Sequence, residues 1–458
     1  MATRPVFMRI FWRILCSVLV VGLALPNPAR AQSGGERISF IRDAEVETII
    51  RGYAAPLFTA AGLDADAVRI YLVNDRRLNA FVAGGQNLFI HTGLLLRSES
   101  PNQVIGVIAH ETGHIAGGHL ARTQEALRNA SAQAIIATVL GAAAAIASGD
   151  GRVAGAAMAG GAGLAQQTIL QYSVTQESAA DQAGLSFLDK TCQSARGLLE
   201  FFRILQEHEL LSAVRQDPYL RTHPLTRQRT DYVEQHVARS RCNDRPDTPE
   251  AVEQHRRMKA KLAAFLDPPS QTLARFKESD TSVAARYARA IAYYRMPDLR
   301  KAVAAIDELI RAEPKNAYFH ELKGQMLFEN GKIAESVAPY EEAVRLLPSA
   351  ALLRIGLAGS LVETNDAQQN KRAIAQLNEA LRVEEKDARA WHLLAVAQGR
   401  DGNLGMSALA LAEEAMARGD KKTARQQAIR ATQQLPSGSP ARMRAEDLKR
   451  DASRKDDE

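Results

Sequence analysis

A five-residue string combines residue types and spacing that suit metal-dependent hydrolysis. Residues 110–114 read His-Glu-Thr-Gly-His. On a helix the two histidines share a face, where imidazoles four residues apart can bind one zinc ion. Glu111 then lies beside the metal without binding it and can accept a proton from the attacking water. Taken alone, the string also fits a solvated helix with incidental histidines, but the apolar residues 104–108 favour a buried helix. We expect His110 and His114 to bind one Zn²⁺ per chain, with Glu111 as the catalytic base.

A third protein ligand must come from elsewhere in the chain. His119 is nine residues after His110, which is about 180° around a helix with 3.6 residues per turn. While the helix persists, His119 faces away from the metal, so we expect a surface or packing histidine.

Glu177 is the better candidate for the third ligand, because it opens a second predicted helix at 176–189. The small residues Ala179 and Ala180 would let that helix approach the first one closely. Asp181, one turn later on the same face, can accept the remaining ring N–H of a zinc histidine. In isolation Glu177 would fit a solvated acidic helix start, but its place downstream of the histidine pair favours a metal ligand.

His223 stands in a Thr-His-Pro turn that its proline makes stiff. Near the zinc, a neutral histidine could donate a hydrogen bond to the oxyanion of the reaction. It could instead occupy the open metal position and silence the enzyme. A loop histidine without contact to the metal is the third reading.

The segments around these residues predict an α+β domain. A helix is expected at 36–62, an alternating strand at 68–73, and two short strands at 79–85 and 87–91 around a Gly-Gly turn. The helix with the histidine pair is expected at 102–127.

The insert at 129–176 carries charge only at Asp150 and Arg152. Each half is long enough to span a bilayer, yet Ala and Gly gain less than Leu or Ile on entering lipid. We expect a closely packed helical hairpin with peripheral membrane contact, and a two-pass insertion is the alternative.

The last third of the chain has the period of a helical repeat. Pro314 and Pro348 lie 34 residues apart, which is the tetratricopeptide period. In that phase, the small-residue positions where the two helices of a repeat cross fall on Ala290, Gly324, Ala358, Ala302, Ser336, Leu309 and Ala343. Tyr340 fills the aromatic position of the repeat. We expect a linker at 266–280, repeats at 281–438 and a charged tail at 439–458. A generic helical bundle is the alternative.

The net charge of +6 over 458 residues at first suggests a nucleic-acid partner. Residues 1–31, however, have a basic start, a short apolar run and an Ala-Arg-Ala end, as in a secretory signal peptide. They hold four arginines and no acid, so the mature chain carries only +6 − 4 = +2. An uncleaved anchor is the alternative. With neither a motif nor a basic patch, no nucleic-acid role is expected.

The cysteines agree with export. Cys16 leaves with the signal peptide, so Cys192 and Cys242 remain as a candidate disulfide in an oxidising compartment. Two buried free thiols are the alternative.

The order of these features resembles the periplasmic BepA-like zinc metallopeptidases of the HtpX-type gluzincin family. The shared features are the signal peptide, the 110–114 string, Glu177 with Asp181, the Thr-His-Pro turn and the repeat array. The resemblance implies His110, His114 and Glu177 as ligands and His223 near the metal, where it regulates access.

The same resemblance implies that an edge of the sheet within 79–91 pairs with the substrate backbone by strand addition. The residues of that stretch expected to contact the substrate are Asn79, Phe81, Val82, Leu88 and Phe89. It also implies contact of the repeats with the outer-membrane assembly machinery.

The sequence therefore predicts a mainly α protein. An α+β zincin-type metallopeptidase domain at 32–265, with a small sheet, precedes an α-helical tetratricopeptide solenoid. The expected function is a periplasmic zinc endopeptidase that degrades misfolded or stalled envelope and outer-membrane proteins, while the repeats recruit partners or clients. The alternative is a chaperone or scaffold for outer-membrane protein assembly with a latent zinc site. Cleavage specificity, the partner of the repeats and the oligomeric state do not follow from the sequence.

Overall fold

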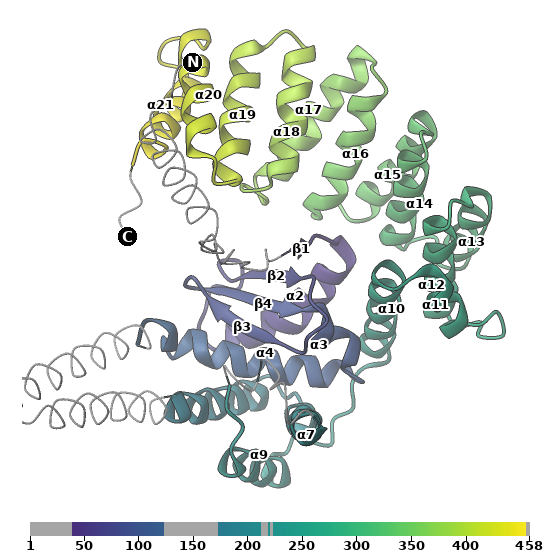
Figure 1. Ribbon diagram of the computed structural model, residues 1–458, viewed down its shortest axis with the longest axis vertical. Helices are drawn as coiled ribbons and strands as arrows, with labels where there is room; N and C mark the ends of the chain where they lie inside the picture. The colour runs from purple at the N-terminus through teal and green to yellow at the C-terminus, as the bar shows by residue number, and fades with distance from the viewer. Residues whose placement is uncertain (1–38, 123–172, 212–218, 220–222, 455–458) are drawn as a thin grey trace, which may run out of the picture. The chain divides into compact units, whose positions relative to one another are not determined.

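The computed structural model describes residues 39–122, 173–211, 219 and 223–454 (Figure 1). The predicted signal peptide and all of the predicted hairpin insert except 173–176 lie outside these residues. Among the residues described, no helix is both long enough and apolar enough to cross a membrane.

A four-stranded sheet forms early in the chain, in the order β1-β2-β4-β3. The strands are β1 (Phe40–Ile41), β2 (Arg69–Val73), β3 (Ala80–Ala83) and β4 (Asn87–His91). β2 and β4 pair in parallel, and the two outer pairs are antiparallel. The three strands predicted from 68 to 91 are confirmed, and β3 forms one edge of the sheet.

The helix predicted at 36–62 begins later than expected. Phe40 and Ile41 pair with β2, and α2 (Ala44–Ala60) starts only after Asp43, whose carboxylate accepts a hydrogen bond from the Val46 amide at 2.9 Å. The aspartate cap satisfies an amide that the first helical turn leaves open, which explains why the helix starts there.

The two faces of the sheet differ because side chains alternate along each strand. One face joins the hydrophobic core with Leu72, Leu88 and Ile90. On the other face Tyr71, Phe89 and Phe81 stack across three neighbouring strands, with ring centroids 5.0 and 4.8 Å apart. Phe40 extends this row from β1 and is 48% exposed.

Helix α4 (Pro101–Ala116) runs beneath the sheet and carries the histidine pair (Figure 1). It packs against α7 (Arg196–Leu211) and against a helix at 173–190, which confirms the helix predicted at 176–189. The remaining helices of this region are α3 (Thr92–Arg97), α9 (Arg227–Arg239) and α10 (Pro249–Leu266). Cys192 and Cys242 form a disulfide that joins the end of the 173–190 helix to the segment after α9, as predicted.

The remainder of the described chain is the short helix α11 followed by five packed helix pairs, α12 to α21. Their bounds are α11 (Pro269–Arg275), α12 (Val283–Arg295), α13 (Leu299–Ala312), α14 (Ala317–Glu329), α15 (Ile333–Leu346), α16 (Ala351–Glu363), α17 (Ala367–Leu381), α18 (Ala388–Arg400), α19 (Leu404–Ala417), α20 (Lys421–Gln434) and α21 (Pro440–Asp451). Gly324 lies against the Tyr340 ring so closely that an added Cβ would be 2.6 Å away, and Gly356 meets the same ring at 2.6 Å. The close helix crossing predicted at Gly324 is confirmed, and its neighbour there is Tyr340.

Two expected boundaries need correction. The linker at 266–280 contains α11, and the charged tail at 439–458 contains α21. Although α21 is rich in charge, Ala445 and Leu448 fall on one face and are buried against α19 and α20. The many charged residues of this segment made its two apolar positions, which share one helix face, hard to recognise in the sequence.

A buried charge cluster lies where α10 meets α2 and the first repeats. The Lys261 ammonium is 2.8 Å from Asp43, 3.4 Å from Glu45 and 3.9 Å from Glu321. The Tyr287 hydroxyl donates a hydrogen bond to Glu45 at 3.0 Å. These acids hold the pKa of Lys261 well above its ordinary value, although burial acts in the opposite direction.

Candidate metal centre

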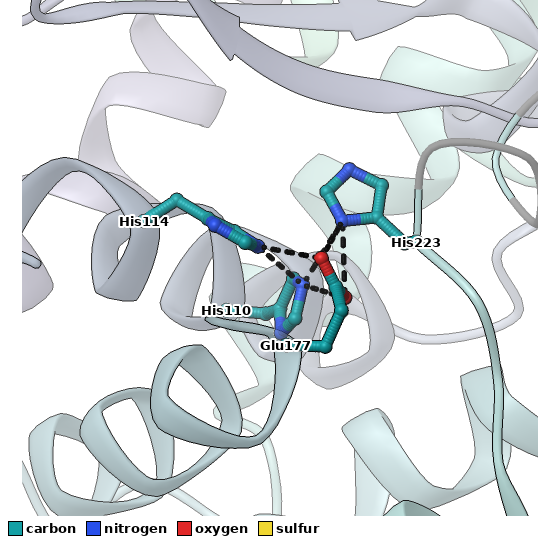
Figure 2. A group of neighbouring side chains, drawn as sticks. All are labelled: His110, His114, Glu177 and His223. Carbon is teal, nitrogen blue, oxygen red and sulfur yellow. Dashed lines mark hydrogen bonds and ion pairs between the residues drawn. The ribbon is translucent and has the colours of Figure 1, made fainter. Parts of the chain in front are cut away.

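Three segments bring four potential ligands together (Figure 2). His110 and His114 come from α4, Glu177 comes from the first turns of the 173–190 helix, and His223 comes from the turn before α9. All four side chains are buried, and one ligand atom from each lies within 4.8 Å of the others.

Five of the six spacings among these ligands are compatible with a tetrahedral zinc site. Four ligands at about 2.0–2.1 Å from one zinc ion lie roughly 3.3–3.4 Å from each other. His110 Nε2 is 3.1 Å from His114 Nε2, 3.4 Å from His223 Nδ1 and 3.4 Å from Glu177 Oε2. Glu177 Oε1 is 3.3 Å from His114 Nε2 and 3.1 Å from His223 Nδ1. The donor set of three imidazoles and one carboxylate is one that zinc prefers.

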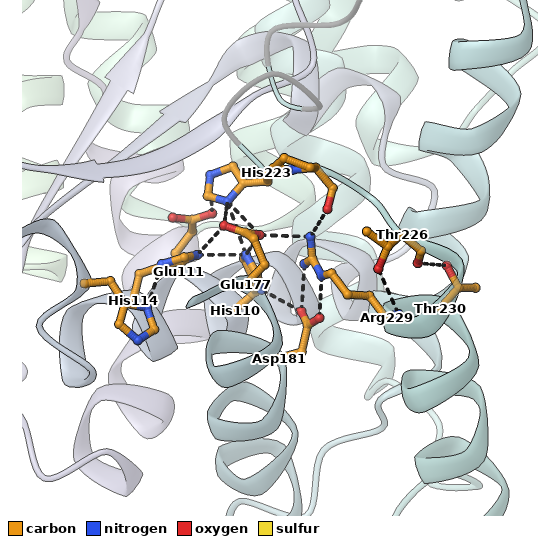
Figure 3. Close-up of polar contacts among 11 residues, drawn as sticks. His110, Glu111, His114, Glu177, Asp181, His223, Thr226, Arg229 and Thr230 are labelled. Atoms are coloured by element: carbon orange, nitrogen blue, oxygen red, sulfur yellow. Dashed lines mark hydrogen bonds and ion pairs between the residues drawn. The ribbon is translucent and has the colours of Figure 1, made fainter. Parts of the chain in front are cut away.

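Glu111 has the place expected of a proton acceptor. Its carboxylate is fully buried, and neither oxygen accepts a hydrogen bond from any residue in the described part of the chain. Figure 3 shows it beside His223, whose Nε2 is 3.6 Å from Glu111 Oε1. Burial raises the pKa of Glu111. A buried carboxyl group without hydrogen bonds is costly unless a polar partner such as water satisfies it.

Asp181 contacts the first histidine at the ring nitrogen that the sequence analysis predicted. Its Oδ1 lies 2.8 Å from His110 Nδ1, the ring nitrogen that points away from the other ligands (Figure 3). Burial alone would lower the pKa of His110, but the hydrogen bonds to Asp181 and Glu177 raise it to about 10. The negative surroundings therefore favour a cation, either a proton or a metal ion, at this ring.

Arg229 is the site residue that the sequence analysis did not identify. Its guanidinium donates to Asp181 Oδ2 at 2.6 Å and Oδ1 at 2.9 Å, and lies 2.9 Å from Glu177 Oε2. Burial raises the pKa of the two carboxyl groups, yet their basic partners lower it overall in both. Around Arg229 the sequence indicates only the start of a helix: Thr226 caps α9, and Arg229 lies in its first turn.

Small residues allow the two ligand-bearing helices to meet. An added Cβ on Gly113 would lie 2.5 Å from the Ala180 carbonyl oxygen, and one on Gly184 would lie 2.9 Å from Ala109. Ala180 thus has the role predicted for it, whereas Ala179 is exposed. This close approach brings Glu177 to the histidines.

His119 is a packing rather than a surface histidine, the two roles that the sequence predicted, but it does not face away from the ligand group. It is only 5% exposed, and its Nδ1 is 3.0 Å from His114 Nδ1. The prediction assumed a helix to residue 127, but α4 ends at Ala116 and Gly118 has φ = +62°. A new helical segment begins at residue 119 and holds His119 beside His114.

The part of the stretch 79–91 that can pair with a substrate backbone is smaller than expected. β4 pairs with both β2 and β3, so Leu88 and Phe89 cannot offer a free backbone edge. Leu88 is also fully buried. Of the two strands in this stretch, only β3, which carries Phe81 and Val82, has an unpaired side within the described sheet, and Asn79 precedes it.

Comparisons with known proteins agree with this arrangement. Residues 41–237 match peptidase family M48, and residues 287–351 match a tetratricopeptide repeat family. Together with the ligand group, these matches define a zinc metalloprotease. The chain carries an M48 peptidase domain followed by tetratricopeptide repeats and is homologous to the beta-barrel assembly-enhancing proteases.

Two of these relatives indicate the extent of the likeness. The putative beta-barrel assembly-enhancing protease of Vibrio cholerae is 27% identical over 76% of this chain and 70% of its own length. The beta-barrel assembly-enhancing protease of Escherichia coli K12 is 25% identical over 75% of this chain and 70% of its own length. Similarity at this level covers both the peptidase domain and part of the repeats.

Proposed function

We propose that His110, His114 and Glu177 hold the zinc ion of this protease and that Glu111 is its catalytic base. When bound, zinc acidifies a water molecule and polarises the substrate carbonyl. Glu111 accepts the proton of that water and passes it to the leaving amine. Its buried carboxylate, without a hydrogen bond from the described residues and next to the ligand group, is the observation that carries the proposal.

Asp181 and Arg229 support the ligands in this proposal. Asp181 accepts the Nδ1–H of His110 and so leaves the Nε2 lone pair for the metal. Arg229 neutralises part of the charge of Asp181 and Glu177, which would otherwise repel each other in a buried site.

His223 closes the site at rest. Its Nδ1 has ligand-like distances to Glu177 and His110, so it occupies the position that a catalytic zinc site keeps for water or substrate. Tyr219 stacks on the His223 ring with centroids 4.6 Å apart and helps to hold it there. Displacement of the His223 ring from this position admits the substrate, and His223 then becomes available to donate to the oxyanion.

The substrates of this proposal are extended or misfolded protein chains. The free edge of β3 can pair with a substrate backbone, and the aromatic row ending at Phe81 offers an apolar surface to alternate substrate side chains. The repeats recruit clients or partners through helical surfaces. The relatives' names point to barrel assembly, so misassembled outer-membrane proteins and their assembly machinery are the proposed clients and partners.

The proposed compartment is the periplasm. The signal-like residues 1–31 and the disulfide between Cys192 and Cys242 both suit an exported protein in an oxidising environment. Peripheral membrane contact through 129–176 remains part of the proposal.

A chaperone or scaffold with a latent site is the second candidate. The four-ligand arrangement with His223 favours it, because structural zinc sites are closed by four protein ligands.

Cleavage of an unfolded outer-membrane β-barrel protein distinguishes the two functions. The purified chain, Glu111→Gln, His223→Ala and the surface control Glu99→Gln are compared at equal zinc content. We expect cleavage by the wild type and the control, faster cleavage by His223→Ala, and none by Glu111→Gln. Equal cleavage by Glu111→Gln would reject the proposed base. No cleavage by any form, with suppression of client aggregation intact, would favour the chaperone.

A further inference from the structure

The turn after α4 places a fourth histidine behind the metal centre. His119 Nδ1 lies 3.0 Å from His114 Nδ1, and the two rings meet edge to face with centroids 5.0 Å apart. We propose that His119 is a positioning residue that accepts a hydrogen bond from His114 and so directs His114 Nε2 toward the metal. The inference rests on the zinc site proposed above.

The direction of this hydrogen bond follows from the placement of the two nitrogens of His114. Its Nε2 faces the ligand group, 3.1 Å from His110 Nε2 and 3.3 Å from Glu177 Oε1. A metal-binding Nε2 carries a lone pair, so the proton of the neutral ring is on Nδ1. His114 Nδ1 therefore donates, His119 Nδ1 accepts, and the proton of His119 is on its own Nε2.

The two zinc histidines thus have partners of different charge. His110 faces the carboxylate of Asp181, whereas His114 faces a neutral imidazole. A second carboxylate here would add negative charge close to Glu177 and Glu111, both already buried, at a large desolvation cost. A neutral acceptor orients the ring without that cost.

The local fold is built to hold the His119 ring. Gly118, at φ = +62°, lies in the turn between α4 and the helical residues 119–122, in a conformation that favours glycine. Gly117 leaves space for the ring, since an added Cβ would lie 2.4 Å from His119 Nε2. Gln176, the residue before Glu177, donates from its side chain to the His119 carbonyl at 3.2 Å. The same contacts therefore link His119 to the start of the helix that supplies Glu177.

The test measures zinc binding and the proton position of His114 in the full chain. His119→Phe keeps a ring but removes the acceptor, while His119→Gln offers a carbonyl oxygen in its place. In chelator competition we expect His119→Phe to bind zinc about 10- to 100-fold more weakly, as for other partners of metal-binding histidines. His119→Gln should recover part of this loss. In ¹H–¹⁵N spectra of the zinc-loaded protein, His114 should carry its proton on Nδ1 in the wild type.

Two further variants keep the inference falsifiable if His119→Phe does not fold. Gly117→Ala displaces the His119 ring and should also weaken zinc binding, whereas Gly52→Ala, with nothing within 4 Å of the added Cβ, should not. Unchanged zinc affinity in the folded His119 and Gly117 variants would overturn the role of His119 alone. If His114→Ala binds zinc as tightly as the wild type, the proposed zinc site itself fails.

Discussion

The contact between Gly113 and Ala180 offers a quantitative test of how the fold positions the metal ligands. In Gly113→Ala the new Cβ would lie 2.5 Å from the Ala180 carbonyl oxygen and 2.9 Å from its Cα, both of them backbone atoms that cannot swing away. Ordinary contact begins at 3.4 Å, so the helices must separate by about 0.9 Å at this point.

That displacement is large compared with the tolerance of a metal site. Ligand distances must stay within about 0.2 Å of their usual values, and Glu177 lies only one turn before Ala180 on the same helix. We therefore expect Gly113→Ala to weaken zinc binding at least roughly tenfold, which corresponds to about 1.4 kcal/mol. Overpacking of the core should also lower the free energy of unfolding by about 1–3 kcal/mol.

Chelator competition and urea unfolding of the zinc-free protein measure the two effects separately. Gly52→Ala in α2 is the matched control, because its Cβ meets nothing within 4 Å and its backbone is helical. It should leave zinc affinity unchanged and raise stability by about 0.4–1 kcal/mol. Zinc affinity and stability of Gly113→Ala equal to those of the wild type would refute the close helix contact.

Three other substitutions test separate parts of the structure. Arg229→Met leaves Asp181 without its guanidinium partner, so the free energy of unfolding in urea should fall by about 3–5 kcal/mol. Chelator competition should show a weaker zinc affinity. Unchanged values of both would contradict the pairing. Lys261→Met removes the ammonium from a buried acidic cluster and should cost a similar 3–5 kcal/mol in urea unfolding; full stability would argue against that cluster. Replacing Cys192 and Cys242 by alanine should cost about 2–4 kcal/mol for a bond across 50 residues, and a reductant that destabilises the variant as much as the wild type would contradict the disulfide.

The local patterns of the sequence were sufficient for the main elements. Strand patterns predicted β2 and β4, and the 34-residue period predicted the helix pairs. In the structure these pairs bury Tyr340 between Gly324 and Gly356. These predictions succeeded because periodicity records which face of an element is buried.

The errors arose where tertiary contacts decide the outcome. His119 was misplaced because the end of α4 depends on the turn at Gly118, which the sequence alone left open. Arg229 was missed because its partners, Asp181 and Glu177, are about 50 residues away and meet it only through helix packing. Ion pairs between distant segments leave no periodic signal in one sequence.

The most direct test of the central claim is anomalous diffraction at the zinc edge from crystals of the full chain. The account predicts one peak, about 2.0–2.1 Å from a nitrogen of His110 and of His114 and from a carboxylate oxygen of Glu177. In the resting state His223 Nδ1 should complete the set. A peak bound by other residues, or zinc bound without Glu177, would contradict the account.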